Sequence, residues 1–212
     1  MAANLIQRMV AMYSLGVRPE ELSSGFDSVV DLISESWLEG KRKLIGAKSK
    51  VLDQYVIDAH TQLLRILSVG FLLNLENCFF QSLSKVIKED EVIDLVFEFI
   101  LSSRLENWEI RHENESYAFE LYGNLKKAID QNDNKEAEQF VKVFLDEDWL
   151  EEQKRSQMHI DPNKDSYYGR WSFESAAVVA IKGLDDSSFR DNEYYPKDLV
   201  DYYRSQKQEE IV

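Results

Sequence analysis

Apolar residues recur at three- and four-residue steps along most of the chain, the spacing that places side chains on one face of a helix. The clearest run, Phe26, Val29, Ile33 and Trp37, lies in a predicted helix over residues 23–46. The same spacing predicts helices over residues 3–15, 50–73, 75–88, 90–103, 118–131, 134–156 and 198–204. Eight glycines and three prolines in 212 residues are too few for the turns of an all-β protein. The pattern therefore predicts an all-α, multi-helix bundle.

Three features within these helices carry specific expectations. Gly70 interrupts an apolar helix at a cost of about 1 kcal/mol relative to alanine, which predicts a closely packed neighbour. Asp94, Glu98 and Ser102 recur every four residues in a segment that is otherwise nearly all apolar, so one edge of that helix is expected to face water. Cys78 lies among apolar residues and is predicted to be a buried free thiol.

A polar stretch over residues 104–117 separates two helical halves. We therefore predict an N-terminal lobe, residues 1–106, and a C-terminal lobe, residues 107–212, that share one core. Residues 175–181 are almost wholly small or aliphatic, and a helix that is apolar all round belongs inside a protein. The surrounding segment, residues 167–203, is expected to place this helix centrally between aromatic-rich loops.

This segment supplies a predicted structural hub. Glu174 is the one acid in its apolar helix, and a buried carboxylate is costly unless it is paired. We interpret Glu174 as a structural group satisfied by Arg170, a tyrosine hydroxyl or backbone donors. The alternative is a general acid or base with a raised pKa. The hub residues are Tyr168, Trp171, Phe173, Glu174, Asp185, Asp186, Tyr194, Tyr195 and Pro196.

Negative charge is concentrated in the second half of the chain. The formal net charge is −14. Residues 1–106 carry 15 acids and 11 Lys or Arg, a balance of −4, whereas residues 107–212 carry 24 acids and 14 Lys or Arg, a balance of −10. An acidic field repels nucleic acid and attracts basic proteins. The charge therefore disfavours direct nucleic-acid binding and favours a basic protein partner.

The densest acidic cluster, which we call the acidic segment, covers residues 146–152. Acids four apart in a helix repel one another by a few tenths of a kcal/mol, so local stability does not account for the cluster. Either a basic partner binds it, or it is a solvated helix face. The candidate partner-binding residues are Asp146, Glu147, Asp148, Glu151 and Glu152, together with Asp161 and Asp165 in the following loop.

The sequence offers little for catalysis or metal binding. Glu109 and His112 form a single Glu-x-x-His, whereas a carboxylate-bridged metal site needs two copies and further glutamates. No nucleophile elbow and no phosphate-binding glycine loop occurs. We expect no enzyme activity, no cofactor and no metal. No run reaches the roughly 20 apolar residues of a membrane helix, and no cleavable leader is visible, so a soluble, cytoplasmic protein is expected.

The C-terminal motifs resemble the PoNi family of immunity proteins. The matching parts are the Trp-x-Phe-Glu-x-Ala-Ala helix from Trp171, Leu-Asp-Asp-Ser-Ser from Leu184 and Tyr-Tyr-Pro-x-Asp-Leu from Tyr194. Met12 to Gly16 and the helix from Leu63 to Leu75 are also similar to the family, so the resemblance spans nearly the whole chain. Lys197 departs from it, because an aromatic residue is common there.

The resemblance implies an immunity protein that binds a cognate PoNe nuclease toxin domain in the cytoplasm and prevents DNA cleavage without catalysis of its own. A nuclease presents cations to phosphates, so an acidic helical surface is expected to dock there. Two alternatives stay open: an acidic, DNA-mimicking regulator without a toxin partner, and a hydrolase built on Glu174. An open pocket reaching Glu174 would favour the hydrolase.

Overall fold

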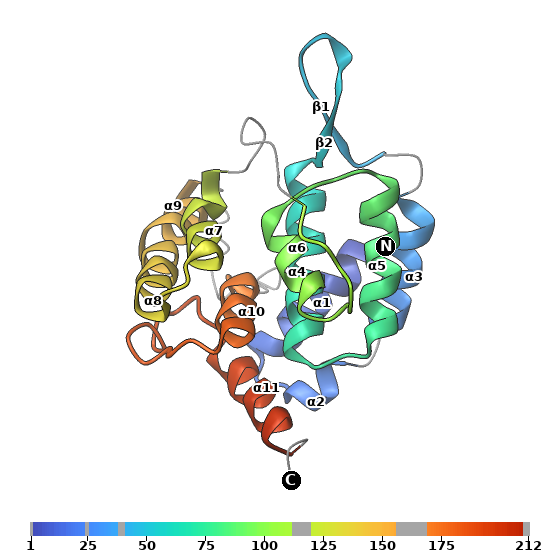
Figure 1. Ribbon diagram of the computed structural model, residues 1–212. Coiled ribbons are helices and arrows are strands. Elements are labelled where there is room, and N and C mark those ends of the chain that lie inside the picture. Colours follow the sequence, from blue (N-terminus) through green and yellow to red (C-terminus); the bar gives the residue numbers. More distant parts are fainter. Residues whose placement is uncertain (1, 24–25, 38–40, 112–119, 156–168, 210–212) are drawn as a thin grey trace.

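The computed structural model is mostly helical, as predicted, with one small sheet (Figure 1). It describes residues 2–23, 26–37, 41–111, 120–155 and 169–209. The helices are α1 (Ala2–Ser14), α2 (Pro19–Leu22), α3 (Phe26–Ser36), α4 (Ile57–Leu72), α5 (Asn77–Glu89), α6 (Leu95–Ser102), α7 (Gly123–Asp130), α8 (Asn134–Val143), α9 (Leu150–Arg155), α10 (Phe173–Lys182) and α11 (Lys197–Glu209). A π-helical segment, η5 (Phe144–Trp149), joins α8 to α9.

An antiparallel hairpin of β1 (Lys43–Ile45) and β2 (Val51–Tyr55) shows that two predicted helices were too long. The prediction of a helix over residues 23–46 is wrong at β1, and that over residues 50–73 is wrong at β2. Alternation from exposed Val51 to buried Leu52 suits a strand with one face inward. The all-α expectation is therefore corrected to a mostly helical fold with a hairpin.

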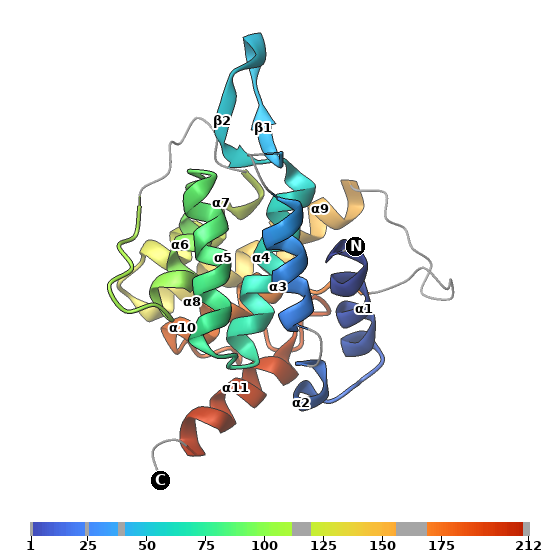
Figure 2. The ribbon, with the colours of Figure 1, turned by 90° about the vertical axis from the view of Figure 1, so that its right-hand side faces the viewer.

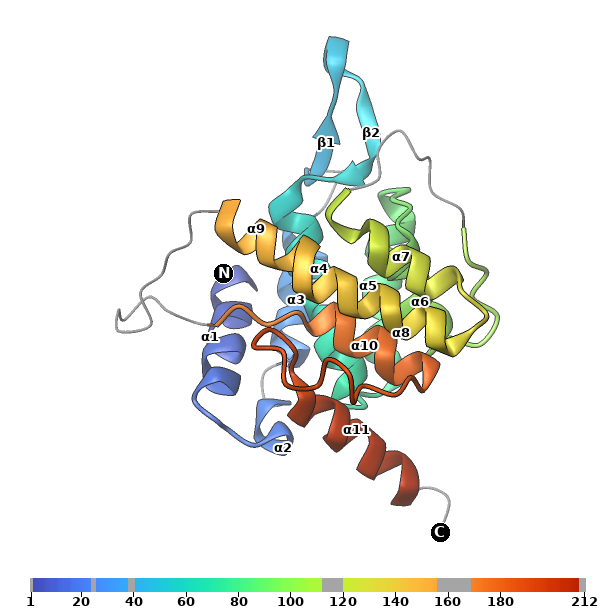
Figure 3. The ribbon, with the colours of Figure 1, turned by 90° about the vertical axis from the view of Figure 1, so that its left-hand side faces the viewer.

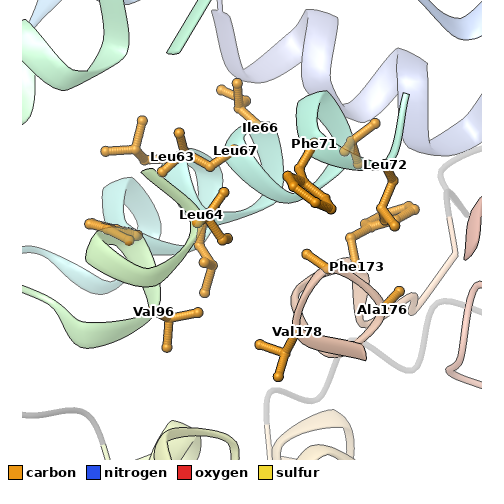
Figure 4. Packing of buried hydrophobic residues seen from close by; sticks show 14 of the residues in the cluster. Leu63, Leu64, Ile66, Leu67, Phe71, Leu72, Val96, Phe173, Ala176 and Val178 are labelled. Carbon is orange, nitrogen blue, oxygen red and sulfur yellow. The ribbon is translucent and has the colours of Figure 1, made fainter. Parts of the chain in front are cut away.

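The core forms where α10 packs against α4. Both helices are buried over most of their length, and α10 also contacts α6, α7, α8 and α11. Figure 4 shows Phe173, Ala176 and Val178 of α10 beside the apolar side chains of α4, among them Phe71 and Leu72. The small Ala176 lets the two backbones approach closely. The helix α10 contacts helices on both sides of the predicted division between lobes at residues 106 and 107. The division itself stays a prediction.

Two of the single-residue expectations have opposite outcomes. The closely packed neighbour of Gly70 is confirmed: a Cβ at this position would lie 2.4 Å from Cε1 of Phe79. The buried thiol is wrong, because Cys78 is exposed in the first turn of α5. Among the described residues, no helix is long and apolar enough to cross a membrane.

The polar edge predicted for α6 faces inward rather than toward water. Asp94 and Glu98 are both buried. Asp94 precedes α6 and accepts hydrogen bonds from the backbone N–H groups of Val96 and Phe97, at 2.9 and 3.1 Å. This is the capping geometry that satisfies the free donors of a helix start. The four-residue spacing of Asp94 and Glu98 therefore reflects buried polar contacts.

Candidate partner-binding surface

The acidic segment lies on one nearly continuous helical rod made of α8, η5 and α9 (Figure 3). Asp133 caps the start of α8 by accepting from the backbone N–H groups of Lys135 and Glu136, at 2.8 and 3.1 Å. Farther along, Phe144 and Trp149 are buried and fix the rod to the core. The indole N–H of Trp149 donates to the carbonyl of residue 170 at 2.9 Å. Three acids of the acidic segment, Asp146, Glu147 and Glu151, are exposed.

The predicted helix over residues 134–156 contains a π-helical turn where the acids are densest. Asp146, Glu147 and Asp148 all lie in η5. In a π-helix the backbone bonds join residues five apart, so four-residue neighbours are not aligned as they are in an α-helix. The like-charge spacing inferred for Glu147 with Glu151 is altered accordingly. Such turns occur frequently at functional sites.

Glu147 and Glu151 are the acids most available to a partner. Both are exposed. Glu151 accepts from the ammonium group of Lys154 at 3.2 Å, an exposed pair in which both side chains remain largely in water. Within the described part of the chain the carboxylate of Glu147 makes no hydrogen bond or ion pair, whereas its backbone carbonyl accepts from the N–H of Leu150. A cationic partner could therefore reach both carboxylates without breaking a buried contact.

The other acids of the segment also make contacts within the protein. The exposed carboxylate of Asp146 pairs with Lys142 and accepts from the amide of Asn192 at 2.8 Å. Half-buried Asp148 accepts from the amide of Asn124 at 2.8 Å. These contacts give part of the cluster a structural explanation that the sequence did not suggest. Glu152 is half-buried, and Asp161 and Asp165 lie outside the described residues.

Within the hub, Asp186 is buried and joins three parts of the C-terminal segment. Its carboxylate accepts from the hydroxyl of Tyr195 and the guanidinium of Arg190, each at 3.1 Å. Arg204 on α11 donates to the other oxygen at 3.2 Å. The neighbouring Asp185 is exposed and accepts from the backbone N–H of Ser187 at 3.0 Å. One aspartate thus connects the segment between α10 and α11 with the middle of α11.

Glu174 is buried and accepts from the hydroxyl of Ser172 at 3.0 Å. Burial raises the pKa of Glu174 to about 7, while hydrogen bonds from its own backbone N–H and from Ser172, together with the charge of Arg65, limit the rise. The predicted backbone donor is therefore present, and Ser172, which was not predicted, supplies a further hydrogen bond. An apolar pocket lies between α1, α2, α3 and α4, and Glu174 is not among the residues that line it. Burial and the hydrogen bond from Ser172 suit a structural carboxyl group.

Aromatic contacts place the remainder of the hub against α1. The rings of Trp171 and Phe173 lie edge-to-face with Tyr13, at 5.0 and 5.6 Å between centroids. The indole N–H of Trp171 donates to the hydroxyl of Ser14 at 2.8 Å. Gly169 has φ of +92°, and a Cβ there would lie 2.3 Å from that hydroxyl oxygen. Tyr194, Tyr195 and Pro196 are buried. Tyr168 lies outside the described residues.

A buried charge cluster was missed by the sequence reasoning. Asp94 Oδ2 lies 3.1 Å from Nε2 of His60 and 3.5 Å from the ammonium of Lys126. Burial alone would raise the pKa of Asp94, but the attraction of His60 and Lys126 holds it below its ordinary value. Similarly, Glu98 pairs with Arg111 at 2.6 Å. The only sequence signal was the repeat of acids in an apolar helix.

Comparison with known proteins identifies one family. Its sequence model, described as PoNe immunity proteins (PoNi), C-terminal, matches residues 92–199, about half of the chain. The match confirms the resemblance carried by the C-terminal motifs. It covers the acidic segment and the helix α10, whereas the hairpin lies outside it. The chain matches no curated protein and no solved structure. In the described residues, no group of three His, Cys, Asp or Glu side chains could hold a metal ion.

Proposed function

The chain belongs to the PoNi family of PoNe immunity proteins, and we propose that it neutralises a cognate PoNe DNase by binding it through the acidic segment. The observation that carries the proposal is the exposure of Glu147 and Glu151 on a helical rod fixed to the core. The half of the chain that contains them has a net charge of −10. The cationic residues with which a nuclease binds DNA can also bind a rigid, exposed anionic surface.

The physical basis is competition for the same cations. A nuclease holds DNA largely through Lys and Arg side chains that contact phosphates. Carboxylates carried on a fixed rod can occupy some of those positions and keep the duplex away from the groove. Complementary charge also speeds the encounter of the two proteins. Inhibition of this kind is stoichiometric and requires no catalytic group on the immunity protein.

The buried acids are not needed for this role. Asp186 and Glu174 have partners inside the protein, and their carboxylates would have to leave those partners to reach a toxin. We therefore infer that substitutions at Asp186 or Glu174 change protection only through the stability of the fold. Substitutions of the exposed acids of the rod should instead reduce protection because contacts with the toxin are lost.

A plasmid-cleavage assay with purified cognate toxin tests the proposal. One equivalent of wild-type protein should stop cleavage. At least about ten times as much of the variant Glu147→Lys/Glu151→Lys should be required for the same inhibition. The matched control is Glu20→Lys/Glu21→Lys on α2. There Glu21 pairs with Arg18 three residues away at 2.8 Å, as Glu151 pairs with Lys154. If the two variants inhibit cleavage equally well, the acidic segment is a solvated face.

A further inference from the structure

The hairpin of β1 and β2, residues 41–56, forms an arm that stands away from the helices (Figures 1 and 2). Its base is anchored in the core. The side chain of Tyr55 is fully buried, and its hydroxyl donates to the carboxylate of Asp90 at 2.8 Å. The backbone N–H of Ile93 donates to the carbonyl of Asp53 at 3.2 Å. An anchored base holds the tip at a fixed place in solvent.

The tip presents an apolar pair to water. Ile45 and Val51 are cross-strand partners, with 67% and 53% of their surfaces exposed. A lone two-stranded hairpin is marginally stable, and exposed strands are normally protected by charged side chains. Lysines lie next to this tip in the sequence, yet the large β-branched side chains of Ile45 and Val51 remain exposed. A partner that covers them would remove apolar surface from water.

The charge of the hairpin is opposite to that of the rest of the molecule. Residues 41–56 contain five Lys or Arg and one Asp, a balance of +4. The other residues therefore sum to −18. A cationic tip is repelled by the cationic groove of a nuclease and by the tip of another hairpin. It fits an apolar recess in an acidic protein surface.

The chain itself carries an apolar recess, beside helices whose sequence is acidic. A pocket of about 300 Å³ opens between α1, α2, α3 and α4. The surrounding segment, residues 1–36, contains five acids and two Lys or Arg, a balance of −3; one of these cations, Arg8, lies on the pocket lining. In the views of Figures 1 and 2 the hairpin tip lies well away from α1 of the same chain. The apolar lining includes Leu5, Ile6, Met9, Met12, Phe26 and Val29.

We propose that the hairpin tip of one copy docks into this pocket on a second copy. If each copy inserts its tip into the other, the contact is two-fold symmetric and closed, as in most homodimers. Ile45 and Val51 would fill the apolar recess, while the lysines around them would face the acidic residues of the N-terminal helices. The acidic segment is not part of this contact. The proposal goes beyond toxin neutralisation and can be tested without a toxin.

Sedimentation equilibrium measures the proposed dimer directly. The average mass of the wild type should rise with concentration from 24.8 kDa toward twice that value. Ile45→Ser/Val51→Ser should raise the dimer dissociation constant about tenfold or more, because both apolar anchors are lost. The control Ile110→Ser removes an exposed isoleucine outside the hairpin and the pocket, and should dimerise like the wild type.

Cysteine crosslinking locates the contact. In a Cys78→Ser background, a mixture of Ile45→Cys and Leu5→Cys proteins should form an oxidised heterodimer that neither protein forms alone. A disulfide requires the two Cβ atoms to approach within about 4.5 Å. Ile45→Cys that crosslinks efficiently to itself would place hairpin against hairpin and overturn the proposal. A wild-type protein that stays monomeric at every concentration would also overturn the proposal. This holds whether the hairpin is then found to bind toxin or anionic lipid vesicles.

Discussion

Two acidic parts of the molecule share the carboxylate group and differ in their surroundings. Asp186 is buried, and a tyrosine hydroxyl and two guanidinium groups surround its carboxylate. Glu147 and Glu151 are exposed on the rod, and the ion pair of Glu151 with Lys154 is exposed as well. A carboxylate that the fold has already paired contributes to stability. One that remains in water is available to a partner.

The difference also gives the two parts different sensitivity to substitution. Removing an acceptor from a buried cluster leaves its donors without a partner, and that desolvation is expensive. Removing an exposed carboxylate leaves nothing buried behind. A loss of protection in cells can therefore have two causes, and measurements of stability separate them.

Asp186→Ala should have the largest effect on stability. It removes the shared acceptor of Tyr195, Arg190 and Arg204, and should cost about 3 kcal/mol, since the two arginines are partly exposed and screened. Urea unfolding would show a midpoint lower by about 1 M. The control is Asp191→Ala, whose carboxylate is 93% exposed and pairs with Lys197 at 2.9 Å. It should leave the midpoint unchanged, and equal midpoints for both variants would contradict the comparison.

Glu174→Gln should have a smaller effect that depends on pH. The pKa of Glu174 is about 7 in the folded protein against an ordinary value of 4.5, so the folded state binds the proton more tightly. The free energy of unfolding should then fall as pH rises from about 4.5 to 7, by on the order of 2 kcal/mol, and stay level above that range.

The measurement is a set of urea unfolding curves between pH 5 and pH 8. Glutamine keeps the size of the side chain and cannot ionise, so the variant should be the more stable protein at pH 8 and nearly equal to the wild type at pH 5. A variant that loses stability with pH as steeply as the wild type would show that Glu174 does not titrate in this range.

Much of the fold was predictable because it depends on local periodicity. The apolar face of the long helices, the close contact at Gly70 and the buried helix α10 all follow from spacing and side-chain size. The hairpin did not, since its strands are held by contacts distant in sequence. Tyr55 is fixed by Trp37, with ring centroids 5.1 Å apart, and by Asp90. Such contacts leave no periodic signal.

The candidate site was predictable in position and not in detail. Charge density alone identified the acidic segment. It could not show that Asp146 and Asp148 bind Asn192 and Asn124, which come from other elements, or that the helix widens at η5. The inward orientation of Glu98 was missed for the same reason, because its partner Arg111 lies on the following loop.

The central claim is that exposed acids of the rod attract the toxin, and stopped-flow association tests it most directly. At nanomolar protein, Glu147→Lys/Glu151→Lys should keep the wild-type melting temperature, associate about tenfold more slowly at low salt, and lose most of the salt dependence of the rate between about 50 and 500 mM. Glu20→Lys/Glu21→Lys should associate nearly as fast as the wild type. If both variants associate with wild-type rates and wild-type salt dependence, the toxin binds elsewhere on the protein.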